Sequence, residues 1–183
     1  MSKKIIITGG LGYIGTELCK IYSVYSWNEK ITVIDNRFIS ERVNQLRKWN
    51  IEFIQGDILN KDDIKQTLSK ADIVHHLAGI TSVPRTNTEI NKNHDEKIKI
   101  TAELGTQNII DLVPENCKII FPSTHVVFEG LQEVKKDISE NEEVNPKLVY
   151  AKSKAENEKQ LKKSNKNYVV LRLGSVYGYS TDT

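Results

Sequence analysis

Short runs of apolar residues alternate along the chain with segments in which apolar residues recur at helical spacing. The consecutive β-branched residues Ile5–Ile7 predict a buried strand over 3–8, because strands covered on both faces of a parallel sheet are apolar throughout. Apolar residues spaced three and four apart then predict a helix over 12–26. The alternation continues, and we expect strands over 31–34, 51–54, 73–77, 118–123 and 168–173, and helices over 39–49, 62–68, 98–112 and 147–163.

Strands that alternate with helices in this way form right-handed βαβ units. We therefore expect an α/β fold: a doubly wound parallel sheet of the Rossmann type, with strand order 3-2-1-4-5-6 and helices on both faces. The 183 residues, 38% of them hydrophobic, suffice for one core and are few for two. No repeat or Pro-rich linker marks a boundary, so we expect a single domain over 1–183.

Charge and cysteine content argue against several classes of function. The net charge is +2 and Lys is interleaved with Asp and Glu, so we expect no nucleic-acid partner. Cys19 and Cys117 lie far apart without ligands at metal spacing, which favours two buried reduced thiols over a disulfide or a zinc site. The apolar run at Ile5–Ile7 is too short for a signal peptide or a membrane span. We expect a cytoplasmic protein with no membrane partner.

A glycine-rich turn, Thr8-Gly9-Gly10-Leu11-Gly12-Tyr13-Ile14-Gly15, stands between the first strand and the first helix. Gly9 and Gly12 would let a pyrophosphate approach the backbone, and Gly15 would let helix and strand pack closely. The N-terminus of the helix would attract the phosphates. The same glycines could make a tight turn in any α/β protein, so the motif indicates a dinucleotide site only in combination with Asp35.

Asp35 ends the second strand, about 20 residues after the last glycine of the turn, where a carboxylate binds the adenosine ribose of a dinucleotide. A carboxylate there repels a 2′-phosphate, which favours NAD over NADP, although Arg37 is close enough to allow some tolerance of NADP. Asp57 follows the third strand, and it either contacts the adenine or is a turn or N-cap residue.

Tyr150 and Lys154 are four residues apart and share one face of a predicted helix. An ammonium and the positive nicotinamide ring would both lower the pKa of Tyr150, which could then take a proton from a hydroxyl as hydride passes to NAD. Thr124, after the fifth strand, could bind the reacting oxygen. Taken alone, Tyr150 and Lys154 could be exposed helix residues, and Ser123 and Thr124 could be cap or turn residues.

Together these motifs resemble the extended short-chain dehydrogenase/reductase family, in particular its NAD-dependent epimerase/dehydratase group. The match runs in family order through the glycine turn, Asp35, Gly56-Asp57-Ile58, His76-Leu-Ala-Gly79, Gly105-Thr106, Ser123-Thr124, Tyr150 to Lys154, and Leu171 to Gly178. The resulting catalytic candidates are Thr124, Tyr150 and Lys154. The cofactor-binding candidates are Gly9, Gly12, Tyr13, Ile14, Gly15, Asp35, Asn36, Asp57, Ile58, Leu77, Ala78, Gly79, Tyr150 and Lys154.

The resemblance implies an NAD-dependent epimerase or oxidoreductase that acts on a nucleotide-activated sugar, with transient hydride transfer to NAD and Tyr150 as the base. It also implies a homodimer, formed through the helices that contain Gly105 and Tyr150. The different-class alternative is a non-catalytic NAD-binding module, and a simple dehydrogenase or reductase is a lesser variant. The four histidines are expected to be structural or solvent-facing.

The sequence departs from the family pattern at several points. Ala102 stands where members often have Asn, and Ser175 stands near the end of the last strand where Asn is usual. His125 and Val126 replace the Asp-Glu pair of dehydratases, which makes water elimination less favoured. The chain ends at Thr183, before the region that supplies much of the sugar-nucleotide pocket in family members, so we expect no substrate domain.

Overall fold

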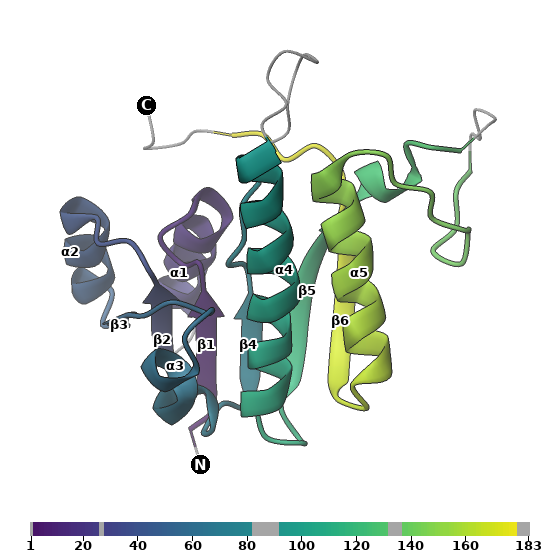
Figure 1. Cartoon of the computed structure of the whole chain (residues 1–183). Helices are drawn as coiled ribbons and strands as arrows, with labels where there is room; N and C mark the ends of the chain where they lie inside the picture. The colour runs from purple at the N-terminus through teal and green to yellow at the C-terminus, as the bar shows by residue number, and fades with distance from the viewer. Residues whose placement is uncertain (1, 26–27, 82–91, 132–136, 179–183) are drawn as a thin grey trace.

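The computed structural model describes residues 2–25, 28–81, 92–131 and 137–178 (Figure 1). Within these residues, six strands form one sheet in the order β3-β2-β1-β4-β5-β6, and every neighbouring pair is parallel, so the predicted topology is confirmed. The strands are β1 (Lys4–Thr8), β2 (Lys30–Asp35), β3 (Glu52–Gln55), β4 (Ile73–His76), β5 (Lys118–Thr124) and β6 (Asn167–Leu173).

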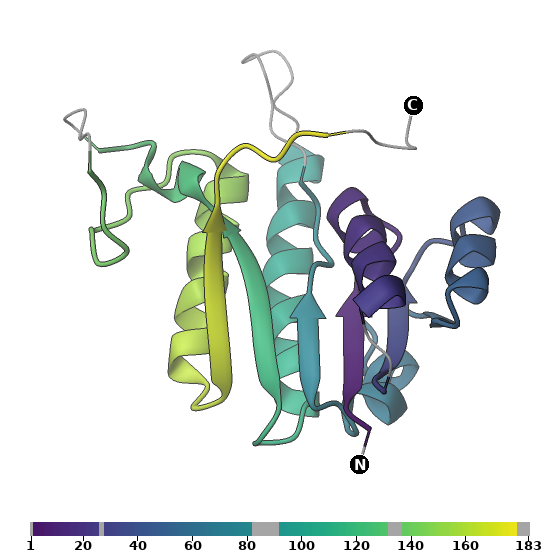
Figure 2. The same ribbon diagram turned by 180° about the vertical axis from the view of Figure 1, so that it is seen from behind.

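Helices lie on both faces of this sheet, as predicted (Figures 1 and 2). In the described parts of the chain they are α1 (Tyr13–Tyr25), α2 (Ser40–Lys48), α3 (Lys61–Leu68), α4 (Lys92–Leu112) and α5 (Val149–Lys163). A short 3₁₀ helix, η2 (His125–Phe128), follows β5 and was not expected from the sequence. The other differences are small shifts of the ends, apart from α4, which begins before the predicted position. The stretch 82–91, between the strand expected over 73–77 and α4, lies outside the described residues.

Two apolar layers hold the helices against the sheet. Ile6 belongs to the layer beneath α3, α4 and α5, whereas Ile5 and Ile7 belong to the layer beneath α1 and α2. Successive side chains of a strand point to opposite faces, so a strand buried on both sides must be apolar at every position. Cys19 and Cys117 are free buried thiols, one in each layer, as predicted, and burial raises the pKa of both.

The α1 side of β5 and β6 carries no helix from the described residues (Figure 2). On that side Val169 and Leu171 are 38% and 43% exposed, whereas Tyr168 and Val170, on the opposite face, pack against the core. The carboxyl ends of all strands meet at one edge of the sheet, which is where open α/β sheets bind their ligands.

Candidate functional site

A cleft of about 1200 Å³ runs along the carboxyl ends of the strands. It is lined by all of the residues that the sequence proposed for the site: Gly9, Gly12, Tyr13, Ile14, Gly15, Asp35, Asn36, Asp57, Ile58, Leu77, Ala78, Gly79, Thr124, Tyr150 and Lys154. A smaller hollow of about 580 Å³ lies beside η2 and contains none of them. Folding thus brings residues from the β1–α1 turn, four strand ends and α5 to one surface.

The glycine turn is packed too tightly to admit side chains at two of its positions. Gly9 has a φ of +69°, and a Cβ there would lie 2.7 Å from the backbone of Ala78. A Cβ on Gly15 would lie 2.6 Å from the carbonyl oxygen of Gly9. The Gly12 N–H donates to that same carbonyl at 3.0 Å and closes the turn. The glycines of the turn also line the cleft, so the backbone at the start of α1 can be approached from it, as binding of a phosphate requires.

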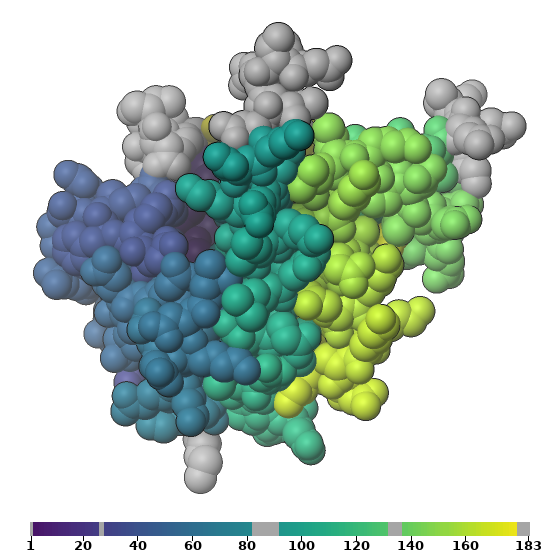
Figure 3. All heavy atoms as spheres, in the orientation of Figure 1, coloured from purple at the N-terminus to yellow at the C-terminus, as the bar shows by residue number. Residues whose placement is uncertain are grey.

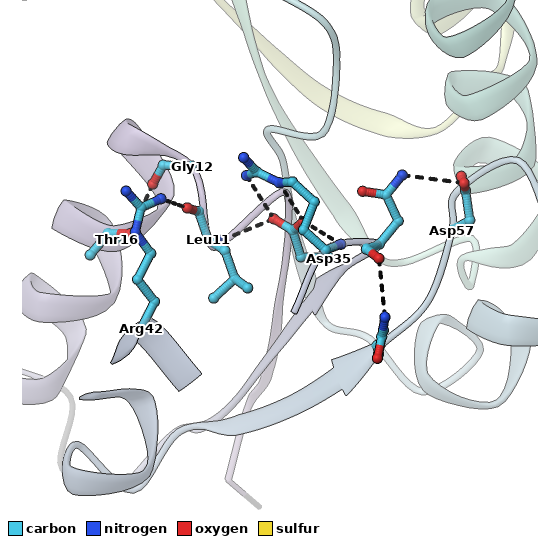
Figure 4. Close-up of polar contacts among 9 residues, drawn as sticks. Leu11, Gly12, Thr16, Asp35, Arg42 and Asp57 are labelled. Atoms are coloured by element: carbon cyan, nitrogen blue, oxygen red, sulfur yellow. Dashed lines mark hydrogen bonds and ion pairs between the residues drawn. The ribbon is translucent and has the colours of Figure 1, made fainter. Parts of the chain in front are cut away.

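Asp35 fixes this turn from β2. Its Oδ2 accepts a hydrogen bond from the Leu11 N–H at 3.1 Å, and its Oδ1 accepts from the Arg37 N–H at 3.1 Å. Arg42, on α2, donates to the Leu11 carbonyl, so the Leu11 residue is held through both its N–H and its C=O (Figure 4). Burial lowers the pKa of Arg42, and repulsion from Arg37 lowers it further.

Asp57 is a turn residue that also lines the cleft. Its Oδ1 accepts from the Leu59 N–H at 2.9 Å, and its Oδ2 accepts from the Asn36 side-chain amide at 3.3 Å. The N-cap of α3 is Asn60, so the N-cap alternative for Asp57 is wrong. The bond to Asn36 ties the end of β3 to the residue that follows Asp35, and both aspartates face the same end of the cleft.

His76 anchors the middle of the cleft through a buried chain of hydrogen bonds. The Ala78 N–H donates to Thr8 Oγ1 at 3.3 Å, and Thr8 Oγ1 also shares a hydrogen bond of 2.9 Å with His76 Nδ1. His76 Nε2 shares a second hydrogen bond, of 3.0 Å, with Thr106 Oγ1 on α4. Burial lowers the pKa of His76 to about 3, so the ring is neutral and structural, as the sequence suggested.

Tyr150 and Lys154 lie one turn apart on α5 and border the other end of the cleft. Lys154 Nζ donates to the Pro122 carbonyl at 2.9 Å and lies 6.0 Å from the Tyr150 ring centroid. Burial lowers the pKa of Lys154 to about 8 and raises the pKa of Tyr150. The lowered pKa expected for Tyr150 is therefore not seen here, because burial of the phenol dominates and the ammonium is directed at a carbonyl.

Thr124 and Ser123 have different partners although they are neighbours on β5. Thr124 Oγ1 accepts from the Val126 N–H at 3.2 Å and caps η2, and the residue also lines the cleft. As an acceptor in that bond, its hydroxyl keeps a hydrogen to donate. Ser123 donates instead to Glu158 Oε1 at 2.5 Å. The cap interpretation of Thr124 is confirmed, and it is compatible with a role in the cleft.

Glu158 is a half-buried ionic partner that sequence reasoning missed. Arg172, on β6, donates to both of its carboxylate oxygens, the shortest contact being 2.7 Å, and also donates to the Glu140 carbonyl at 2.9 Å. With the Ser123 bond, this pair ties β5, α5 and β6 together behind Lys154. The available signal was spacing, since Glu158 follows Lys154 by one helical turn.

Ala102 does not break the contact between α4 and α5. Asn157 Nδ2, on α5, donates to the Ala102 carbonyl oxygen at 2.9 Å, and the Gln160 side chain donates to the Glu103 carbonyl at 3.0 Å. Both bonds use the backbone of α4, so they do not depend on the side chain at residue 102.

A family model described as the NAD dependent epimerase/dehydratase family matches residues 5–183. The chain belongs to this family. The fold, the order of the motifs and the cofactor predicted from the glycine turn and Asp35 all agree with it, since the family is one of NAD-dependent enzymes.

Relatives in this family include several sugar-nucleotide epimerases. The Pisum sativum bifunctional UDP-glucose 4-epimerase and UDP-xylose 4-epimerase 1 is 31% identical over 140 residues, 69% of this chain and 38% of the relative. CDP-paratose 2-epimerase of Salmonella typhi is 33% identical over 142 residues, 72% of this chain and 40% of the relative. The chain thus spans about two fifths of the length of these curated relatives.

Solved structures of the family share the fold. The UDP-glucuronic acid 4-epimerase from Bacillus cereus, in complex with NAD, superposes with a TM-score of 0.77 at 25% identity, over 96% of this chain and 57% of that chain. In the described parts of the present chain, no helix is long and apolar enough to cross a membrane. The same residues contain no group of three His, Cys, Asp or Glu side chains arranged to hold a metal ion.

Proposed function

We propose that the cleft binds NAD and that its Tyr150 end carries the redox step of epimerisation of a nucleotide-activated sugar. The observation that supports this most is the composition of a single cleft. A phosphate-binding turn and Asp35 line one end of it, and Thr124, Tyr150 and Lys154 line the other. A dinucleotide has its phosphates and its reactive ring at separate places, and this cleft has matching chemistry at each.

The chain's own residues fit such a cofactor. Gly9, Gly12 and Gly15 line the cleft without side chains, and the start of α1 would offer N–H donors to a pyrophosphate. Asp35 is the carboxylate for the adenosine ribose, and Asp57 and Asn36 extend that end of the site. Leu77–Gly79 would line the path to the Tyr150 end, where Lys154 would bond the second ribose.

When bound, NAD accepts a hydride from the sugar carbon and later returns it. Tyr150 would take the proton of the hydroxyl on that carbon, so that loss of a proton and a hydride leaves a ketone, and would give the proton back when the hydride returns. The Thr124 hydroxyl hydrogen would bind the same oxygen. Lys154 would stabilise the Tyr150 phenolate electrostatically, which offsets the effect of burial on the pKa of Tyr150.

A product assay with a matched pair of variants tests this proposal. The relatives named above act at different sugar carbons and on UDP- and CDP-sugars, so the panel with NAD should include both nucleotides and report C2 and C4 epimers. We expect Tyr150→Phe to lose turnover at least about 100-fold, the usual contribution of a general acid–base, with NAD affinity nearly unchanged. Tyr25→Phe, on the exposed end of α1, is the control.

Calorimetric titration with NAD separates the possible outcomes. Epimerised product that depends on Tyr150 supports the proposal. Unchanged turnover in Tyr150→Phe removes that residue from the mechanism. NAD binding with no product from any sugar favours the non-catalytic NAD-binding module instead, and absence of NAD binding overturns the cofactor site itself.

We further propose that the chain forms a homodimer through the outer faces of α4 and α5. These helices lie side by side on one surface (Figure 3), and Ile100 and Leu104, one turn apart on α4, are 44% and 47% exposed. Light scattering after size exclusion should give twice the chain mass, and Ile100→Ser with Leu104→Ser should give the monomer. A monomer from the unaltered chain would rule the dimer out.

We also expect a cytoplasmic location, which fractionation of a tagged chain checks.

A further inference from the structure

The carboxylate of Asp35 is already fully hydrogen-bonded before any ribose arrives. Oδ1 accepts from the Arg37 N–H at 3.1 Å and from the Arg37 Nε–H at 3.2 Å. Oδ2 accepts from the Leu11 N–H at 3.1 Å and makes a longer contact of 3.5 Å with Arg37 Nη2. A carboxylate has about four acceptor positions, so a ribose can bind only if some of these bonds are released.

The bonds that can be released come from the Arg37 side chain. The two backbone donors are fixed by the end of β2 and by the glycine turn, whereas the Arg37 side chain is 55% exposed against 4% for Asp35. Because the guanidinium lies on the solvent side of the pair, water can hydrate it while the ribose hydroxyls take its place on Asp35. The Arg37 side chain occupies one acceptor position on each carboxylate oxygen of Asp35. The two neighbouring hydroxyls of a ribose would need the same two acceptor positions, one on each oxygen.

We propose that Arg37 sets the cofactor selectivity of this site, leaving Asp35 when the ribose binds and then facing the 2′ position, where it allows a 2′-phosphate. The inference rests on the proposed NAD site. Arg37 is only two residues beyond Asp35, so its guanidinium stays beside the ribose after it is displaced. A guanidinium and a phosphate form short charge-assisted bonds, which partly offset the repulsion between that phosphate and Asp35.

Arg42 supports this role through its charge. Its guanidinium is bonded to the carbonyl of Leu11, the residue whose N–H binds Asp35, and so lies just behind that end of the cleft (Figure 4). Repulsion from Arg37 contributes to the lowered pKa of Arg42, and attraction to Asp35 opposes it, which shows that the three charges interact. Two cations therefore surround one carboxylate. These two positive charges offset part of the repulsion between Asp35 and a 2′-phosphate, so the corner accepts NADP as well as NAD.

Calorimetric titrations of one variant with both dinucleotides test the proposal. In Arg37→Ala the ribose no longer competes for Asp35, so NAD should bind up to about fivefold more tightly. NADP should bind at least about threefold more weakly, because its phosphate loses the guanidinium. Arg37→Lys keeps the charge and should retain most of the NADP affinity. Arg47→Ala, an exposed arginine on α2, removes the same charge elsewhere and should move neither affinity selectively.

Opposite shifts for the two cofactors in Arg37→Ala, absent from Arg47→Ala, support the inference. Weaker NAD binding in Arg37→Ala would overturn it, because Arg37 would then hold the cofactor rather than compete with it. Equal changes in the affinities for NAD and NADP would mean that Arg37 acts only through its general charge, and would also overturn the inference. If the unaltered chain binds NAD but Arg37→Ala changes nothing, only this inference fails. If the unaltered chain binds neither dinucleotide, the proposed cofactor site fails with it.

Discussion

Replacing Lys154 with Met should make the protein more stable at neutral pH. Burial lowers the pKa of Lys154 from 10.5 to about 8, although Glu158 acts in the opposite direction. Each pKa unit corresponds to about 1.4 kcal/mol, so the charged ammonium costs the folded state about 3 kcal/mol at pH 7. Lys154→Met removes that cost and leaves the Pro122 carbonyl without its donor, a loss of about 1 kcal/mol. The net expectation is a gain of about 2 kcal/mol.

The pH dependence identifies the cause of this gain. Between the folded pKa and the unfolded pKa, the unfolded state binds more protons at Lys154, so this residue makes the unaltered protein relatively more stable as pH rises through that window. The advantage of Lys154→Met should therefore be complete below the folded pKa and should disappear as pH approaches 10.5. Other titrating groups are common to both proteins and cancel in the difference.

Urea unfolding followed by circular dichroism, across the range between those two pKa values and below it, measures the difference. Lys152→Met is the matched control, because Lys152 is exposed on the same helix and should show no such trend. A Lys154→Met protein that is less stable than the unaltered one at pH 7 would refute the reasoning. So would a stability difference that stays constant with pH, since the ammonium would then not be desolvated in the folded state.

Three further substitutions test the packing around the cleft. Gly9→Ala should lower the free energy of unfolding in urea by more than about 1 kcal/mol, because the residue has a positive φ and its Cβ would meet Ala78. The same substitution should weaken NAD binding. Thr106→Val should cost about 1–3 kcal/mol in the same assay, because His76 Nε2 would be buried without its hydrogen-bond partner. Glu158→Gln should lower stability by about 2 kcal/mol, measured as a lower Tm, because it leaves the Arg172 guanidinium without its counter-charge. An unchanged Tm would show that this ion pair does not stabilise the fold.

The fold could be predicted almost completely because its signals are local. The strand β1 has three consecutive apolar residues, Ile5–Ile7, and the change to helical spacing after the glycine turn marks the first βα unit without any tertiary information. What could not be predicted is η2, which is four residues long and is started by the Thr124 side chain. So short a turn has no periodicity of its own, and Thr is common in turns of many kinds.

Hydrogen bonds that join distant elements explain what the sequence did not reveal about the site. Arg42 binds the Leu11 carbonyl from another helix, and Glu158 binds Ser123 from α5, so neither pairing follows from spacing along the chain. The contribution of Lys154 to a lowered Tyr150 pKa is not seen for a related reason. The sequence shows that Lys154 is near Tyr150, but not that both are half-buried or that Pro122 takes the ammonium's hydrogen bond.

The two ends of the cleft are therefore determined in different ways. At the adenosine end, the Asp35 side chain binds the Leu11 N–H of the glycine turn, so the geometry of this end is set within the first βαβ unit. At the catalytic end, Thr124 and Lys154 come from different elements, which Glu158 and Arg172 hold together through β5, α5 and β6. Loss of the Glu158 pair should therefore disturb the catalytic end while NAD binding at the Asp35 end persists. Equal losses of turnover and NAD affinity in Glu158→Gln would show instead that the two ends are not independent.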